Sequence, residues 1–175
     1  MCGGVIFPYN REHRVMLAQL LPPDQVDAIE QSGVVRSVFW GRTEPVLPAL
    51  LSGEEEDEEV SRIFLWGNRN KEISLPQTGW ARIESMIGGK WDYLRPSQVV
   101  IPVTHGVEKG KWFEINHGIR GVLVSRDGHE RVYMLTEEAN PEFLNVTGHP
   151  RMPVLVEQDD FPWLPADPAG TLYAP

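Results

Sequence analysis

Short apolar segments separated by glycine, proline and charged residues make up most of this 175-residue chain. Three of them in the first half, residues 5–7, 34–40 and 62–66, are rich in Val, Ile, Phe and Trp and predict β-strands. From residue 98 onward the pattern is typical of β structure, and Asp127-Gly128 predicts a tight hairpin turn because glycine tolerates a positive φ. The strands expected in this half span residues 98–103, 111–115, 119–125, 131–136 and 152–156.

Helices are expected to be few and short. Residues 25–30 predict a helix that ends near Gly33. A second helix is expected over residues 81–87, where two glycines follow. A third is expected to start after Asn140, whose side chain can cap it, and to run to Asn145.

This mixture lacks a βαβ rhythm, so we expect an α+β fold rather than a doubly wound parallel sheet. The length suits one core, which we assign to a single domain over residues 1–160. The Pro- and Ala-rich residues 161–175 are expected to be a tail that wraps the surface or is disordered. Residues 41–61 contain a proline-rich stretch and a run of acids, and we expect a surface loop there.

Composition narrows the classes of function. The sequence has no apolar run of about 18 residues and no secretory signal, so we expect a cytoplasmic protein with no membrane partner. The single cysteine excludes an internal disulfide and a cysteine-based zinc site, and we expect no cofactor and a monomer. The net charge of −9 argues against strong nonspecific binding to nucleic acid. Six of the acids are consecutive, and we expect them to be solvated, with DNA mimicry or metal binding as the alternative: Glu54, Glu55, Glu56, Asp57, Glu58 and Glu59.

Cys2 is the most informative position for chemistry. If Met1 is removed, the chain begins with a free α-amine with a pKa of about 8 beside a thiol with a pKa of about 8.5. Such an aminothiol can form an imine with an aldehyde and then close a five-membered thiazolidine. The same two groups also serve in N-terminal nucleophile hydrolases. Considered alone, Cys2 is more simply interpreted as an incidental, partly buried thiol.

Later segments change this interpretation of Cys2. The chain opens with Met1-Cys2-Gly3, and the segments that matter then follow in a defined order: Trp66-Gly67, Ala81-Arg82-Ile83-Glu84-Ser85, Ile101-Pro102 with Glu108, Tyr133-Met134-Leu135-Thr136 with Ala139, and His149-Pro150-Arg151-Met152-Pro153-Val154. Together they resemble the SOS-response-associated peptidase (SRAP) family, from Met1 to about Val156. The His-x-Arg-Met-Pro block is the most specific of them.

The resemblance implies a fold and a function. The expected fold is a compact α+β domain whose bent, mainly antiparallel sheet forms a barrel-like core with short helices around it. The expected function belongs to the DNA damage response: the protein would bind single-stranded DNA that contains an abasic site. It would then cross-link to that site through the thiazolidine of Cys2.

The same resemblance assigns roles to two other residues, which we expect to meet Cys2 in one groove. Glu108 would act as the general acid and base that opens the closed sugar, and this role requires a raised pKa. His149 would assist the ring opening or orient the sugar oxygen. The alternatives are a solvated turn residue for Glu108 and a structural helix-capping histidine for His149.

Four further residues are expected at the DNA. The resemblance implies that Arg82 and Arg151 bind the strand, with the guanidinium of Arg82 on a backbone phosphate. An ion pair with an acid such as Glu84 is the alternative for Arg82. Trp66 and Trp80 could stack on bases, with core packing as the alternative for either one.

The chain also departs from the family pattern. Trp80 stands where the family has an asparagine, and the indole nitrogen cannot accept a hydrogen bond. Gly106 is displaced by one position, and a gapped alignment brings His105 or Glu114 to the place of Glu108. A divergent, phage-associated member is therefore one interpretation. The alternative functions are a catalytically weakened SRAP-like DNA-binding or regulatory protein and, further away, an N-terminal nucleophile amidohydrolase.

Overall fold

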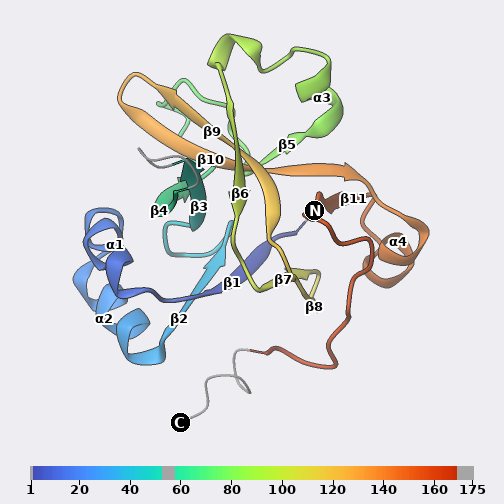
Figure 1. Ribbon diagram of the computed structural model, residues 1–175, viewed down its shortest axis with the longest axis horizontal. Helices are drawn as coiled ribbons and strands as arrows, with labels where there is room; N and C mark the ends of the chain where they lie inside the picture. Colours follow the sequence, from blue (N-terminus) through green and yellow to red (C-terminus); the bar gives the residue numbers. More distant parts are fainter. Residues whose placement is uncertain (1, 53–57, 169–175) are drawn as a thin grey trace.

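The computed structural model describes residues 2–52 and 58–168. These residues form an α+β fold whose sheet is mainly antiparallel and closes into a five-stranded barrel with short helices around it (Figure 1). This finding confirms the fold class expected from the sequence. Met1, most of the acidic run and the end of the chain lie outside the described residues, so the expectations for them stay predictions.

The barrel closes at its longest strand, β10. This strand pairs antiparallel with β9 on one side, where His129 lies opposite Arg126, and parallel with β4 on the other, where Arg131 lies opposite Leu65. The turn between β9 and β10 is Asp127-Gly128, and both residues have a positive φ, as the predicted hairpin requires. The barrel strands are β3 (Val46–Ser52), β4 (Glu59–Trp66), β6 (Ser97–Ile101), β9 (Ile119–Arg126) and β10 (His129–Glu138).

Beyond the barrel, two short strands pair with the second half of β10. β5 (Trp80–Arg82) pairs with it in parallel, and β11 (Arg151–Pro153) pairs with it antiparallel. The segments that carry Trp80, Arg82 and Arg151 therefore meet along one strand, although they are far apart in the sequence.

A second sheet contains four strands in the order β2-β1-β7-β8. β1 lies in the middle and is antiparallel to both neighbours, with Gly4 opposite Val107 of β7. This pairing brings Cys2, just before β1, to the hairpin between β7 and β8. The strands are β1 (Gly4–Pro8), β2 (Val34–Val38), β7 (His105–Glu108) and β8 (Lys111–Glu114).

The helices lie at the periphery, with α1 and α2 together at one end and α4 at the opposite end (Figure 1). Gly33, at a φ of 74°, ends α2, and the Asn140 side chain caps α4 by accepting a hydrogen bond from the Phe143 N–H at 2.7 Å. No helix in the described part of the chain is long and apolar enough to span a membrane. The helical segments are η1 (Arg11–His13), α1 (Arg14–Leu20), α2 (Pro23–Ser32), α3 (Ile83–Ile87), η2 (Asp92–Leu94) and α4 (Pro141–Thr147).

The start of the segment expected to be a tail packs on the domain. The Phe161 side chain is 4% exposed, and its ring lies 4.9 Å from that of Phe113 in β8 and 4.9 Å from that of Phe143 in α4. The Trp163 ring lies 5.5 Å from that of Phe113, and the Leu164 N–H donates to the Trp112 carbonyl at 2.8 Å. Residues 161–164 therefore contribute to the hydrophobic core.

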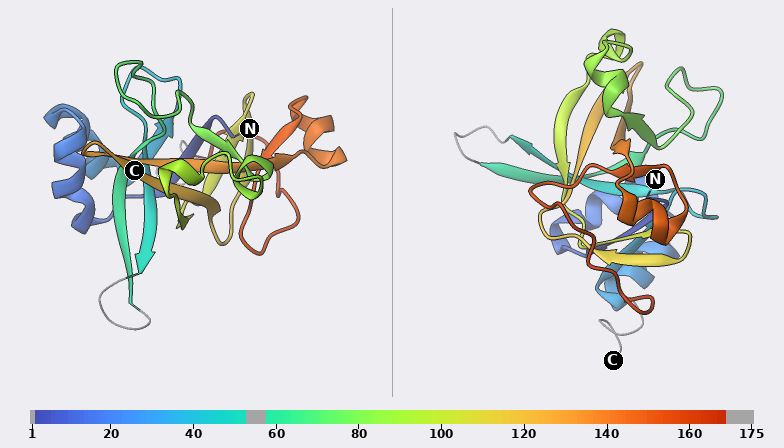
Figure 2. Two further views of the ribbon diagram at one scale, coloured as in Figure 1. Left: turned by 90° about the horizontal axis from the view of Figure 1, so that it is seen from above. Right: turned by 90° about the vertical axis from the view of Figure 1, so that its right-hand side faces the viewer.

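Several elements differ from the sequence-based expectations. β3 and the start of β4 occupy much of the expected surface loop, and the hairpin that they form extends away from the helices (Figure 2). β3 pairs with β4 along its whole length, from Val46 opposite Leu65 to Ser52 opposite Glu59. Pro48 lowers the local preference for a strand, and this long-range pairing compensates for it. The helix expected over residues 81–87 begins later, because its first two residues belong to β5, and the elements α1 and β7 were not expected.

Candidate functional site

Cys2 lies at the junction of the two sheets. The N–H of Gly3 donates to the Val107 carbonyl at 2.9 Å, and the Gly3 carbonyl accepts from the Phe39 N–H at 3.1 Å. The first of these hydrogen bonds continues the pairing of β1 with β7 toward the N-terminus, and the second continues its pairing with β2. The Cys2 side chain is 0% exposed and belongs to the main hydrophobic cluster, together with Phe39 and Phe113.

Gly106 is the residue that makes room for the thiol. A Cβ at this position would lie 2.9 Å from Cys2 Sγ and 2.6 Å from Phe113 Cζ, which is closer than atoms in a packed core can approach. Only glycine therefore fits between the two side chains. A glycine within a strand often marks such a close approach, and this is the sequence signal for Gly106.

Burial controls the acidity of the thiol. Burial raises the pKa of Cys2 to about 12, backbone hydrogen bonds at Val107 and Gly4 lower it, and the negative charge of Glu108 raises it. The thiol also donates to the Gly4 carbonyl, with Sγ 3.0 Å from the oxygen. Because the thiolate is the nucleophile, Cys2 is unreactive in this conformation.

Glu108 and His149 both lie within electrostatic reach of this position. Glu108, at the end of β7, is 7% exposed, and its charge raises the pKa of the Cys2 thiol as well as that of the His149 imidazole. The structure thus brings together the three residues proposed for catalysis from the sequence. The buried position of Glu108 replaces the solvated turn residue that was the alternative.

His149 is held by the segment between α4 and β11. Its backbone N–H donates to Thr147 Oγ1 at 3.1 Å, and its Nδ1 accepts from the Arg151 N–H at 3.1 Å. Burial lowers the pKa of His149, followed by smaller effects of the charges around it. The imidazole is therefore mainly neutral at pH 7.

The two tryptophans expected to stack on bases are part of the core. Trp66 is 1% exposed and donates from Nε1 to the Gly79 carbonyl at 2.9 Å, while Trp80 is 8% exposed and donates to the Cys2 carbonyl at 3.0 Å. Their ring centroids are 5.7 Å apart, and both rings contact Phe39. Neither ring presents a face to solvent, so the stacking role is not supported and the packing alternative holds.

The two arginines differ in their availability. Arg151 donates from both terminal nitrogens to the Glu84 carboxylate, at 3.0 and 2.8 Å, and from Nη2 to the Thr136 carbonyl at 2.8 Å. This bidentate pair joins β11 to α3 and occupies the guanidinium that was expected at the DNA. Arg82 lies exposed at the end of β5, where a phosphate could reach it.

Some observations limit the chemistry of this site. Among the residues that the structure describes, no group of three or more His, Cys, Asp and Glu side chains could hold a metal ion.

The two residues that a gapped alignment offers in place of Glu108 are less suitable. His105 is 9% exposed and its Nδ1 lies 2.9 Å from Thr104 Oγ1. Glu114, the other alternative, is exposed on β8. Glu108 is thus the carboxylate best placed to act near Cys2.

Comparison with known proteins shows the fold. No family model and no curated protein matches the chain. The structure is similar to the crystal structure of a protein from Bacteroides thetaiotaomicron, with a TM-score of 0.56 and 16% sequence identity over 90% of this chain and 78% of that one. At this identity the similarity extends to the α+β fold with its mainly antiparallel barrel.

Proposed function

We propose that this chain is a SRAP-type protein that binds single-stranded DNA at an abasic site and links to it covalently through Cys2. The observation that supports this proposal best is the convergence of Cys2, Glu108 and His149 at one place, from the N-terminus, β7 and the segment after α4. A buried carboxylate within electrostatic reach of a neutral imidazole suits proton transfer to and from a sugar oxygen.

The proposed reaction begins with the amine. Once Met1 is removed, the α-amine of Cys2 attacks the aldehyde of the opened sugar, and the aldehyde oxygen leaves as water to give an imine. The thiol then adds across the C=N bond, with sulfur bonding to carbon and the thiol proton passing to nitrogen. No oxidant or reductant is needed. Glu108 would move protons during ring opening, and His149 would orient the sugar oxygen.

The buried thiol sets one requirement for this reaction. Cys2 Sγ is packed against Gly106 and is held by the Gly4 carbonyl, so ring closure requires the segment before β1 to turn its side chain outward. The hydrogen bonds of Gly3 to Val107 and Phe39 hold this segment on both sides, so the turn outward is a local opening of the sheet.

A second candidate function is a non-covalent SRAP-like DNA-binding or regulatory protein. It is favoured by the thiol pKa of about 12 and by Trp80, whose indole donates to the Cys2 carbonyl in the region where the family resemblance expects an asparagine. In this alternative Cys2 acts as a core residue and the barrel serves as a binding surface.

A cross-linking experiment separates the two functions. Protein shown by mass to lack Met1 is incubated with a single-stranded oligonucleotide that carries one abasic site, and the products are run on a denaturing gel. We expect wild type to give a stable band without added reductant. Cys2→Ala should give a band only with borohydride, because its amine forms an imine that cannot close a ring.

The role of Glu108 is tested in the same assay. We expect Glu108→Gln to slow cross-linking by about 10²-fold or more, as removal of a general acid and base does. The matched control is Glu114→Gln, which removes an exposed carboxylate from the neighbouring strand and should leave the rate unchanged. No band from wild type that lacks Met1 would reject the covalent function and favour the second candidate.

A further inference from the structure

A pocket of about 820 Å³ lies between the end of β4, the loop that follows it and the start of β10. Trp66, which lines this pocket, contacts Trp80, and Trp80 in turn contacts Cys2, so aromatic rings lie between the pocket and the site described above. Volumes of this size are typical of small-molecule sites. The polar lining residues include Glu44, Arg69, Asn70, Lys71, Gln77 and Arg131.

Arg131 is the most unusual of these residues. It is 8% exposed, and in the described part of the chain its guanidinium makes one hydrogen bond, from Nη1 to the Glu130 carbonyl at 2.9 Å, and no ion pair within 4.0 Å. Burial lowers the pKa of Arg131, which shows the cost of holding its charge there. Buried arginines are usually paired, so the donors of Arg131 are suited to an anionic ligand.

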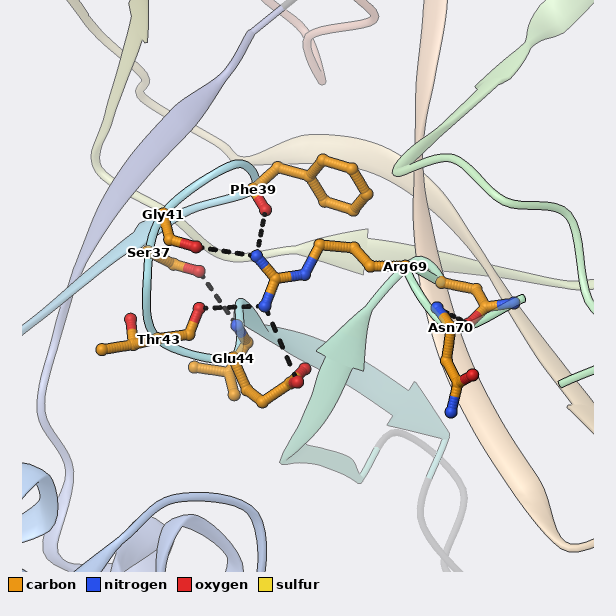
Figure 3. Close-up of polar contacts among 9 residues, drawn as sticks. Ser37, Phe39, Gly41, Thr43, Glu44, Arg69 and Asn70 are labelled. Atoms are coloured by element: carbon orange, nitrogen blue, oxygen red, sulfur yellow. Dashed lines mark hydrogen bonds and ion pairs between the residues drawn. The ribbon is translucent and has the colours of Figure 1, made fainter. Parts of the chain in front are cut away.

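Arg69 also lines the pocket, but most of its hydrogen-bond donors are already used within the protein. Its Nη1 donates to the carbonyls of Phe39 and Gly41, at 3.1 and 2.8 Å, and its Nη2 donates to that of Thr43 at 3.4 Å and lies 3.6 Å from Glu44 (Figure 3). These contacts fix the segment after β2 against the loop after β4. Its positive charge nevertheless remains next to the pocket.

The lining of the pocket is positively charged, although the whole chain is negatively charged. Arg69, Lys71 and Arg131 outnumber the single acid of the lining, Glu44, in a protein whose net charge is −9. Asn70 and Gln77 add amide groups that can donate hydrogen bonds. The combination attracts an anion and can also bind neutral polar groups of the same molecule.

We propose that this pocket binds a small phosphorylated molecule whose phosphate accepts hydrogen bonds from Arg131. The planar guanidinium matches the geometry of phosphate oxygens, so that two N–H groups can donate to one phosphate. The volume leaves room for more than the phosphate group, and Asn70 and Gln77 are among the residues that line it. This site is independent of the function proposed for Cys2.

Binding is tested by calorimetry with three probes: inorganic phosphate, pyrophosphate and adenosine monophosphate. We expect wild type to bind at least one of them and Arg131→Met to bind it about 10-fold or more weakly. The matched control is Arg120→Met, which alters an exposed strand arginine outside the pocket and should bind as wild type does. Circular dichroism and urea unfolding verify that Arg131→Met is folded.

Two variants of exposed residues keep the proposal testable if Arg131→Met does not fold. Lys71→Met should weaken binding severalfold, and Glu44→Gln should strengthen it, because one removes a cation and the other removes the acid of the lining. Opposite signs for these two variants would support the pocket. Equal binding by wild type and both variants, or no binding of any probe, would overturn it.

A single-stranded oligonucleotide without an abasic site tests whether the pocket binds nucleic acid instead of a small molecule. If the oligonucleotide binds in a manner that depends on Arg131 while none of the three small probes does, the pocket belongs to a nucleic-acid surface and the proposal of a small ligand is rejected. If a small probe binds and the oligonucleotide does not displace it, the proposal is supported.

Discussion

The indole nitrogen of Trp80 donates a hydrogen bond to the backbone carbonyl of Cys2 across 3.0 Å, although the two residues are 78 positions apart in the sequence. The contact joins the start of the chain to β5 and, through β5, to the long strand β10. Movement of the segment before β1 away from β5 therefore has to open this contact.

We predict that Trp80→Phe makes the Cys2 thiol more reactive. Phenylalanine keeps an aromatic ring beside Phe39, although a smaller one, and lacks the donor, so the segment before β1 loses a hydrogen bond worth about 1 kcal/mol. If the thiol reacts from a locally open state, labelling with a disulfide reagent should be about 5-fold faster. The rate of thiol release, followed by absorbance, measures this effect.

Trp66→Phe is the matched control for this prediction. It removes a similar hydrogen bond in the same aromatic cluster, but one that goes to the Gly79 carbonyl, at 2.9 Å, and not to Cys2. A comparable loss of stability with little change in labelling is expected. Equal acceleration in both variants would mean that the thiol is exposed by global unfolding rather than by opening at Trp80.

We predict that Gly106→Ala destabilises the protein by about 1–3 kcal/mol, as overpacking in a core does. The new methyl group would clash with Phe113 and with the sulfur of Cys2. Combining it with Cys2→Ala should recover part of the loss, which a double-mutant cycle in urea unfolding measures. Gly3→Ala, where a Cβ meets nothing within 4 Å, should change stability little.

We predict that Arg151→Lys lowers the free energy of unfolding by roughly 1–2 kcal/mol, because one ammonium cannot replace a guanidinium that binds Glu84 and the Thr136 carbonyl together. Arg82→Lys, at an exposed position on the same strand system, is expected to have little effect. A stable Arg151→Lys variant with greatly reduced DNA affinity would instead return Arg151 to a DNA-binding role.

We predict that the protein loses stability as the pH falls below about 6.5. His13 in η1 is 5% exposed, its Nε2 lies 3.0 Å from Ser61 Oγ, and burial lowers its pKa. The unfolded chain binds protons at a higher pH than the folded one, so acid favours unfolding, and the loss levels off below the folded pKa.

Urea unfolding between about pH 5 and 8 tests this dependence. The slope should become smaller in His13→Gln. It should not vanish, because burial also lowers the pKa of His105 and of His149. A slope of the same size in His13→Gln and wild type would contradict the assignment to His13.

The local pattern of the sequence was sufficient for elements whose limits depend on their own residues. The helix that ends at Gly33, the helix capped by Asn140 and the hairpin at Asp127-Gly128 are each determined by backbone preferences of one or two residues. The mixture of these elements also predicted the α+β class correctly.

Other elements depended on partners that are distant in the sequence. β3 forms despite Pro48 because β4 pairs with it along its whole length, and β7 forms because β1 and β8 lie on either side of it. Strand pairing of this kind has no local signal, since the hydrogen bonds are made between segments that the sequence does not bring together.

The candidate site likewise has features that were predicted from the sequence and features that depend on residues distant in the sequence. The sequence by itself, through its resemblance to the SRAP family, led to the proposal that Cys2, Glu108 and His149 carry the chemistry. Only the tertiary structure decided that the thiol points into the core beside Gly106, that both tryptophans are buried and that Arg151 is held by Glu84. The physical reason is that burial and pairing, which set the pKa and the accessibility of a side chain, belong to the packed sheets and not to any single segment.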